Sequence, residues 1–217
     1  MKILFQGDSI TDGGRIKTNT WDLNHQMGHG YASIINSSLG TKHPDKMFTF
    51  INRGISGNRI ADLFGRWKED TLAHNPDIIS VLIGINDVFF QLTEGIGSEY
   101  ERFKKIYRLL LEEAREQNQN VKFVLLEPFM LPVADKVDNF NEYMVYLEPL
   151  QKAIKEIAEE YNAVFVPLQE KFNELAEKYG ADYWIWDGIH PTVCGHQIIA
   201  DEWIEICKKT ILSDIEN

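Results

Sequence analysis

The amino-acid sequence predicts an α/β fold, a three-layer α/β/α sandwich around a five-stranded parallel sheet. Two observations lead to this prediction. Short apolar segments alternate along the chain with longer segments whose apolar residues recur at helical spacing, which is the order expected of strand–helix–strand units. The short segments are also continuously apolar rather than alternating, as in strands that are buried on both faces of a parallel sheet.

Five apolar segments are the expected strands. They span residues 2–6, 46–52, 77–83, 121–126 and 163–167. The third is the most continuous and the fifth is the shortest. A helical pattern separates each from the next, and the right-handedness of such crossovers restricts the topology of the sheet.

Three segments place their apolar residues on one helical stripe. They run from Phe103 to Ala114, from Tyr143 to Tyr161 and from Ile198 to Cys207. In the first two, the opposite face is rich in Glu and Lys, which indicates a solvated surface rather than a binding site. Residues 30–39 and 58–74 are further helix candidates.

The length and charge of the chain restrict its class. Its 217 residues contain no linker, repeat or break in composition, and we expect one domain over residues 1–217. The 22 basic and 33 acidic side chains give a formal net charge of −11. This charge argues against nucleic acid and against anionic membranes as partners, because both bind clustered Lys and Arg.

The sequence contains no recognisable targeting or membrane segment. Its first residues lack the apolar region and cleavage site of a signal peptide, and no run of about 18 apolar residues is present. Cys194 and Cys207 would lie roughly 20 Å apart on one helix, too far for a disulfide. We therefore expect free thiols and a cytoplasmic protein.

Four polar clusters lie in loops of the predicted fold. Residues 7–14, 52–58 and 84–87 follow the first three strands, and residues 186–192 precede the last helix. Open parallel sheets bind ligands beyond the carboxyl ends of their strands. Each cluster alone is a weak indication, but together they contain the residue types that acyl transfer requires.

The clusters supply a nucleophile, a base and an orienting carboxylate. Ser9 lies at a strand end before a turn, and a serine is a weak nucleophile until a base takes its proton. His190 is the candidate base, and Asp187, three residues earlier, is the candidate for fixing its tautomer. Asn86 offers a side-chain N–H and Gly57 an accessible backbone N–H, and both are suited to hold an oxyanion.

In these blocks the chain resembles the SGNH hydrolases, also called the GDSL esterase family. The matching motifs are Gly-Asp-Ser-Ile at Ser9, Gly-Ile-Ser-Gly-Asn at Gly57, Gly-Ile-Asn-Asp at Asn86 and Asp-Gly-Ile-His-Pro at His190, in the family's order. The resemblance implies a flavodoxin-like sandwich and a Ser/His/Asp hydrolase without metal or organic cofactor.

The resemblance also implies a role for each site residue. Ser9 would be the nucleophile, His190 the base and Asp187 the orienting carboxylate. The Ser9 N–H, the Gly57 N–H and the Asn86 side chain would form the oxyanion hole. The neighbouring Asp8 and Asp87 are expected to be structural, and Gly54 is expected to be a turn glycine.

Within the family the chain is most similar to small intracellular acetylxylan esterases, which share these motifs and a Trp directly before the Asp. This similarity implies removal of O-acetyl groups from xylo-oligosaccharides or similar sugars by a homo-oligomer. Aromatic faces stack on sugar rings. The residues expected to line the pocket, all in loops on the side of the site, are Trp186, Phe89 and Trp21.

Three alternatives are open at this point. A thioesterase or lysophospholipase-like enzyme would use the same residues on longer acyl chains. A flavodoxin-like module would bind phosphate or a nucleotide at the glycine-rich first loop, although Asp8 beside that loop argues against an anion. Asp187 and His190 could bind zinc with His196, but no HExxH or CxxC motif accompanies them.

Overall fold

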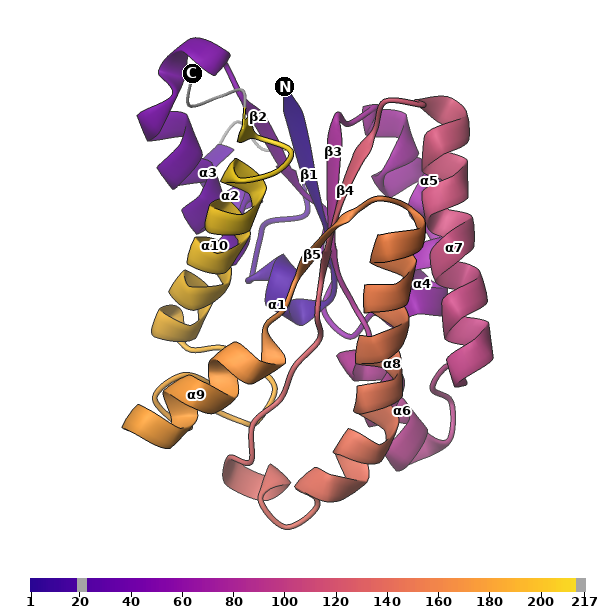
Figure 1. Cartoon of the computed structure of the whole chain (residues 1–217), viewed down its shortest axis with the longest axis vertical. Coiled ribbons are helices and arrows are strands. Elements are labelled where there is room, and N and C mark those ends of the chain that lie inside the picture. The colour runs from indigo at the N-terminus through magenta and orange to yellow at the C-terminus, as the bar shows by residue number, and fades with distance from the viewer. Residues whose placement is uncertain (19–22, 214–217) are drawn as a thin grey trace.

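The computed structural model of the chain describes residues 1–18 and 23–213. Within these residues, one sheet of five parallel strands lies between two layers of helices (Figure 1), which confirms the predicted fold class. The strand order is β2-β1-β3-β4-β5. The bounds are β1 (Lys2–Gly7), β2 (Thr49–Asn52), β3 (Ile78–Leu82), β4 (Lys122–Leu126) and β5 (Val164–Val166).

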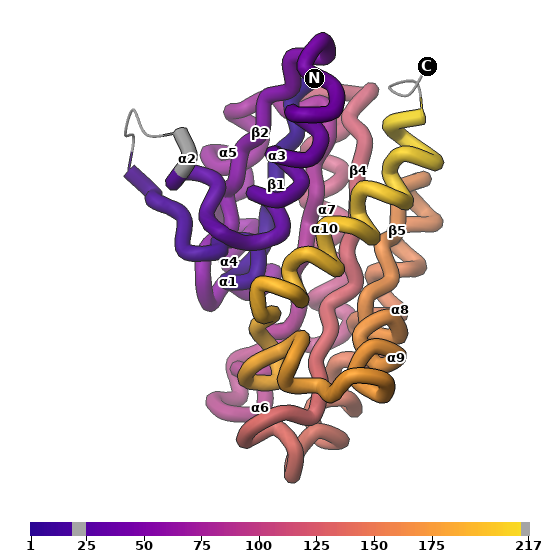
Figure 2. Tube along the Cα trace, turned by 90° about the vertical axis from the view of Figure 1, so that its left-hand side faces the viewer, coloured from indigo at the N-terminus to yellow at the C-terminus, as the bar shows by residue number. Residues whose placement is uncertain are grey.

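Helices cover both faces of the sheet. On one face lie α3 (Tyr31–Lys42) and α10 (Val193–Lys208), side by side in Figure 2. The other face is covered by α4 (Ile60–Gly65), α5 (Trp67–Asp70), α7 (Tyr100–Gln117) and α8 (Phe140–Glu160). The remaining elements are α1 (Ser9–Asp12), α2 (Leu23–Gln26), α6 (Ile85–Glu94), α9 (Gln169–Tyr179), η1 (Pro44–Lys46), η2 (Leu72–His74) and η3 (Ala134–Lys136).

The core is built on the central strands. Every residue of β3 is buried, as is all but the first of β1, as expected of strands covered by helices on both sides. Phe5 of β1 packs edge-on against Tyr31 of α3 and at a tilt against Trp203 of α10. The buried hydroxyl of Ser80 accepts a hydrogen bond of 3.0 Å from the Trp203 indole, so the polar atom in the middle strand has a partner.

Two predicted elements differ from the structure. Strand β2 begins at Thr49 instead of residue 46, because the 3₁₀ turn η1 starts at Pro44 and Met47 has a positive φ of 46°. The helix expected over residues 58–74 is broken into α4, α5 and η2. The break falls at Arg66, whose guanidinium donates to the backbone carbonyls of Arg53 and Gly7.

Helices α6 and α9 were not predicted, nor were the one-turn helices α1 and α2. Helix α6 follows β3, and it contains Phe89, which was expected in a loop. That expectation was wrong. The polar motif at the start of α6 was interpreted as a loop, and the short amphipathic pattern that follows the motif was overlooked. Helix α9 follows β5. In the described part of the chain, no helix is both long enough and apolar enough to cross a membrane.

Candidate active site

The candidate site lies at the carboxyl edge of the sheet. Strand order reverses between β1 and β3, and open α/β sheets bind ligands at such a switch point. Helix α1 follows β1 and α6 follows β3, so Ser9 and Asn86 start from neighbouring strands. Residues 53–58 follow β2, and the segment before α10 closes over the same edge (Figure 1).

A tight turn places Ser9 at the start of α1. A side chain at Gly7 would overlap the carbonyl oxygen of Leu82, so β1 can approach β3 here because of the glycine. Asp8 is the N-cap, and its carboxylate accepts a 3.0 Å hydrogen bond from the Ile10 N–H. Gly13 ends the helix in the left-handed conformation at φ 54°. Ser9 is therefore held in a short, capped turn.

The loop after β2 is fastened to the loop after β1. The buried Asn52 side chain donates to the carbonyls of Thr11 and Met27, at 2.6 and 2.9 Å, and accepts from the Gly54 N–H at 2.9 Å. The two donated bonds fix the end of β2 relative to α1 and Met27, and the bond accepted from Gly54 holds the loop's own backbone. Sequence reasoning missed Asn52, although a polar residue at the carboxyl end of a predicted strand was an available indication.

The two glycines of this loop have different roles. A Cβ at Gly54 would overlap the backbone nitrogen of Asp12, so this glycine permits close packing of the loops. Gly57 has φ +81°, and a Cβ there would meet nothing within 4 Å. The backbone of Gly57 thus borders open space, as an approaching substrate requires.

We expect Gly54→Ala to lower the free energy of unfolding by about 1–3 kcal/mol, because the added methyl group forces the two loops apart. Gly40→Ala is the matched control, since Gly40 lies in α3 with nothing within 4 Å of its Cβ position. That variant should gain about 0.5–1 kcal/mol from helix propensity. Urea unfolding of both variants measures the difference, and equal stabilities would contradict the packing role of Gly54.

Helix α6 is attached to the same loop at two consecutive residues. The Asn86 side-chain amide donates to the Asn58 carbonyl at 3.1 Å, and the buried Asp87 carboxylate accepts from the Ile60 N–H at 3.0 Å. These bonds hold α6 in register with the segment that carries Gly57. Sequence analysis placed Asn86 at the site but did not identify Asn58 as its partner.

The structure brings Ser9, His190 and Asp187 together. Ser9 Oγ lies 2.8 Å from His190 Nε2, and His190 Nδ1 lies 2.6 Å from Asp187 Oδ2. The other carboxylate oxygen of Asp187 accepts from the backbone N–H groups of Ile189 and His190, at 3.0 and 2.7 Å. Asp187 thus orients both the imidazole and the backbone that carries it.

A loop that sequence reasoning did not include supports the Asp187–His190 turn. Gly188 has φ +90°, and its carbonyl accepts a 3.0 Å hydrogen bond from the Leu131 N–H. The buried stem of Lys136 packs against Gly188, where a Cβ would lie 2.6 Å from the Lys136 Cγ. No local pattern in residues 131–136 indicates this contact, which depends on the tertiary fold.

The arrangement shifts the pKa values of His190 and Asp187 in opposite directions. The hydrogen bond with Asp187 raises the pKa of His190 above its usual value. Burial acts to raise the pKa of Asp187, but the hydrogen bonds from His190 and Ile189 outweigh it and hold that pKa below its usual value. Burial raises the pKa of Asp8 to about 7 and that of Asp87 to about 6.

The aromatic residues expected at the pocket lie in different places. The Trp186 ring stacks on the His190 ring, with centroids 5.7 Å apart and planes inclined by 22°. Phe89 is half-buried in α6, where it packs edge-on against Phe90 and on the core. Trp21 lies outside the described residues. Of the three, Trp186 is the one that the described contacts place beside His190.

The zinc alternative receives no support from the geometry. His196 faces α3, where its Nδ1 accepts a 3.2 Å hydrogen bond from the Tyr31 N–H. Across residues 1–18 and 23–213, no group of three or more His, Cys, Asp or Glu side chains is arranged to hold a metal ion.

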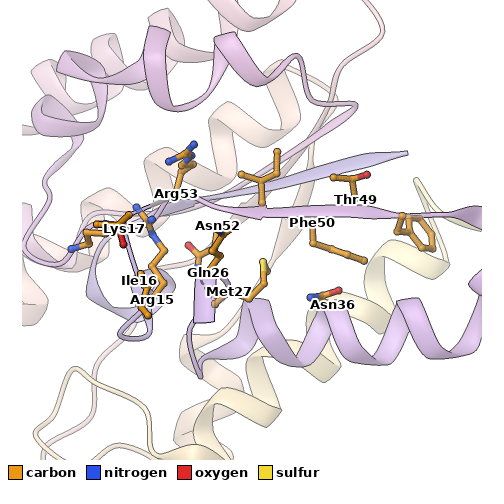
Figure 3. Close-up of a pocket in the computed structure, with 13 residues that line it drawn as sticks. Arg15, Ile16, Lys17, Gln26, Met27, Asn36, Thr49, Phe50, Asn52 and Arg53 are labelled. Carbon is orange, nitrogen blue, oxygen red and sulfur yellow. Dashed lines mark hydrogen bonds between the residues drawn. The ribbon is translucent and has the colours of Figure 1, made fainter. Parts of the chain in front are cut away.

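A cavity of about 320 Å³ opens on the outer edge of β2, near the site (Figure 3). Its walls come from residues 15–18, from Gln26 and Met27, from Asn36 of α3 and from the strand. Asn52 and Met27 lie below the strand in Figure 3, whereas the Arg53 guanidinium points to its other side. The lining residues do not include Ser9, Asp187 or His190, so this cavity is separate from their hydrogen-bonded chain.

Comparison with known families identifies the chain. The GDSL-like lipase/acylhydrolase family model matches residues 5–198, a span that contains all the site residues described above. The chain belongs to this family. As a GDSL-like acylhydrolase it is a carboxylic ester hydrolase, so the non-enzymatic alternative of a flavodoxin-like binding module is not retained.

Similar proteins agree with this assignment. The acylhydrolase is 34% identical over 203 residues to an acetylxylan esterase of Geobacillus stearothermophilus, an alignment that covers 92% of this chain and 90% of that protein. A putative GDSL-like lipase of Parabacteroides merdae has a TM-score of 0.85 at 35% identity, over 94% of both chains. Axe2, an acetylxylan esterase of Geobacillus stearothermophilus, has a TM-score of 0.82 at 32% identity, over 94% of this chain and 92% of that one.

Proposed function

We propose that this acylhydrolase is a serine esterase that removes short acyl groups, in particular O-acetyl groups from xylo-oligosaccharides or similar carbohydrates. The observation that carries the reaction is the continuous chain of hydrogen bonds from Ser9 Oγ through His190 to Asp187. The similarity to acetylxylan esterases over more than nine-tenths of the chain supports the choice of acetylated sugar.

In the first step, Ser9 Oγ attacks the ester carbonyl carbon while His190 Nε2 takes the hydroxyl proton. Asp187 accepts the hydrogen bond from Nδ1–H, which keeps Nε2 free as a base and stabilises the imidazolium that forms. The raised pKa of His190 matches this role, because a higher pKa makes the imidazole a stronger base. The consequence is that His190 is protonated, and inactive as a base, at acidic pH.

In the proposed oxyanion hole, the Ser9 N–H, the Gly57 N–H and the Asn86 amide hold the developing charge. The Asn86 amide has two N–H donors, and one of them is used by the Asn58 carbonyl at 3.1 Å. That bond orients the amide, and the second N–H is the donor assigned to the oxyanion. An oriented donor costs no reorganisation during the reaction.

The tetrahedral intermediate then breaks down to an acyl-enzyme. His190 returns its proton to the oxygen of the leaving alcohol, and the ester bond of Ser9 replaces that of the substrate. A water molecule next attacks the acyl carbonyl carbon and gives a proton to His190. His190 returns this proton to Ser9 Oγ as the bond between Oγ and the acyl group breaks and the acid leaves. Each proton thus passes through one nitrogen, His190 Nε2.

The exposure of the site supports a substrate in which a small acyl group is esterified to a large polar alcohol. The His190 side chain is 35% exposed and Trp186 is 61% exposed, so the serine is reached from the surface. A bulky sugar can remain largely in solvent while its acetyl group reaches Ser9. Trp186 is the aromatic residue that this proposal retains beside the substrate, and roles for Phe89 and Trp21 stay predictions, as do the homo-oligomer and the cytoplasmic location.

We expect Asn86→Ala to lower kcat by about 10²–10³-fold, the loss measured for single oxyanion donors in other hydrolases. KM for p-nitrophenyl acetate should change little, since the bond to the oxyanion strengthens in the transition state. Asn120→Ala, at an exposed asparagine before β4, is the control and should be neutral. An unchanged kcat in Asn86→Ala would remove this amide from the reaction.

The test of the proposal is acetate release from acetylated xylo-oligosaccharides, measured beside p-nitrophenyl acetate and p-nitrophenyl octanoate. Rapid release from the sugar by the wild type, absent in Ser9→Ala, is the expected result. Faster hydrolysis of octanoate than of acetate, without release from the sugar, would overturn the substrate assignment in favour of a thioesterase or lysophospholipase-like activity.

A further inference from the structure

The stacking of Trp186 on His190 has a role beyond lining the site. The two rings are 5.7 Å apart between centroids and nearly parallel, at 22°. One face of the indole is therefore turned to the imidazole, while the side chain as a whole stays 61% exposed. From this geometry we infer that Trp186 is a positioning residue of the acid–base step, whose ring face stabilises the protonated imidazole of His190. The inference rests on the proposed role of His190 as the base.

The local backbone holds the two rings in this position. The Trp186 N–H donates to the His190 carbonyl at 3.1 Å, and Ile185 pairs with Pro191 in an antiparallel bridge. Residues 185–191 thus form a closed turn in which Trp186 and His190 are cross-strand partners. The stacking is built into this turn and does not depend on a bound substrate.

The other groups around His190 leave the ring face to Trp186. Asp187 bonds Nδ1 and Ser9 bonds Nε2, both at the edge of the imidazole ring. From other elements, the buried Asp8 before α1 also favours the protonated form of His190. Burial lowers the pKa of His196 in α10 to about 4, so this second imidazole is neutral near neutral pH. Trp186 is thus the group that covers a face of the ring among the described contacts.

The chemistry of the reaction gives this contact its effect. Above its pKa, His190 is neutral in the resting enzyme and becomes an imidazolium when it takes the Ser9 proton. A cation over an aromatic face is stabilised by the ring quadrupole, typically by about 0.5–1 kcal/mol at an exposed site. Because this stabilisation is greater in the transition state than in the ground state, its loss lowers the rate.

The same contact predicts a characteristic pH dependence for Trp186→Leu. Above the pKa of His190, the variant should lose about two- to fivefold in kcat/KM, which is the fold-change that 0.5–1 kcal/mol corresponds to. Below that pKa the resting wild-type enzyme also carries the imidazolium, which Trp186 stabilises equally. The rates of the two proteins should therefore converge as the pH falls, and the acid limb of the variant should move to lower pH.

The experiment compares three proteins over the full pH profile: wild type, Trp186→Leu and Trp186→Phe. The phenylalanine keeps a ring face and should restore most of the rate and of the acid limb. Tyr183→Leu is the control, because Tyr183 is similarly exposed, at 56%, but packs against Trp184 instead of His190. It should leave the profile unchanged.

A second measurement is independent of the esterase reaction. Titration of the His190 ring by NMR, assigned through its absence in His190→Asn, should show a lower pKa in Trp186→Leu than in the wild type and in Trp186→Phe. An unchanged pKa would overturn the inference, as would a rate loss that is constant with pH and lies in KM, which indicates substrate contact alone. Failure of the proposed function is seen separately, as activity retained by Ser9→Ala.

Discussion

Ser9→Ala is expected to lower kcat by at least about 10³-fold while the fold is retained. The substitution removes one oxygen atom, and the hydrogen bond that this oxygen forms is the one to His190 at 2.8 Å. The caps that shape α1 come from the Asp8 side chain and the Gly13 backbone, so neither depends on the Ser9 hydroxyl.

The measurement is the rate with p-nitrophenyl acetate and with acetylated xylo-oligosaccharide, together with the melting temperature. Ser37→Ala is the matched control: this exposed serine of α3 bonds a carbonyl of its own helix, and its loss should leave kcat unchanged. A purified Ser9→Ala protein that still turned over at the wild-type rate would disprove the nucleophile assignment.

Asp187→Asn is expected to lower kcat by about 10⁴-fold near neutral pH, as in another triad with this change. In the wild type, the Ile189 and His190 N–H groups donate to Asp187 Oδ1 at 3.0 and 2.7 Å. The side-chain oxygen of asparagine can accept the same two hydrogen bonds. Its NH₂ group then faces His190 Nδ1, which must become an acceptor. The proton moves to Nε2, where it blocks the base that Ser9 requires.

The loss in Asp187→Asn should be accompanied by a lower pKa of His190, since the hydrogen bond with Asp187 is the main cause of its elevation. Asp45→Asn is the control. It replaces an exposed carboxylate in η1 and should change neither kcat nor the pKa of His190, measured by NMR titration. If the asparagine variant kept most of its turnover, the base would have to be oriented by another group.

Much of the fold could be predicted because the patterns that indicate its strands and helices lie within short stretches of sequence. The apolar runs of β1, β3 and β4 are each continuous and bounded by polar residues, and the stripes of α7, α8 and α10 repeat over several turns. The break at Arg66 could not be predicted in this way. It depends on hydrogen bonds to carbonyls of Arg53 and Gly7, which are distant in sequence.

The same distinction applies to the site. Ser9, Asn86 and His190 lie in recognisable motifs, and the topology of a parallel sheet brings the ends of neighbouring strands together. Asn52 and Lys136 lie in no motif, and what they do is visible only in their contacts with Thr11 and Gly188. Residues that hold loops together are recognised by their contacts, and a single sequence does not show which distant residues they contact.

The separation of Ser9 and His190, by 181 positions, has a consequence for biosynthesis. The serine leaves the ribosome 181 residues before the imidazole that would activate it in the proposed mechanism. Until α10 has packed beside α3, Ser9 is an ordinary alcohol without a base. If Ser9 and His190 act as proposed, a nascent chain carries no reactive serine that could acylate itself, and catalytic competence arises only when these two distant segments have met.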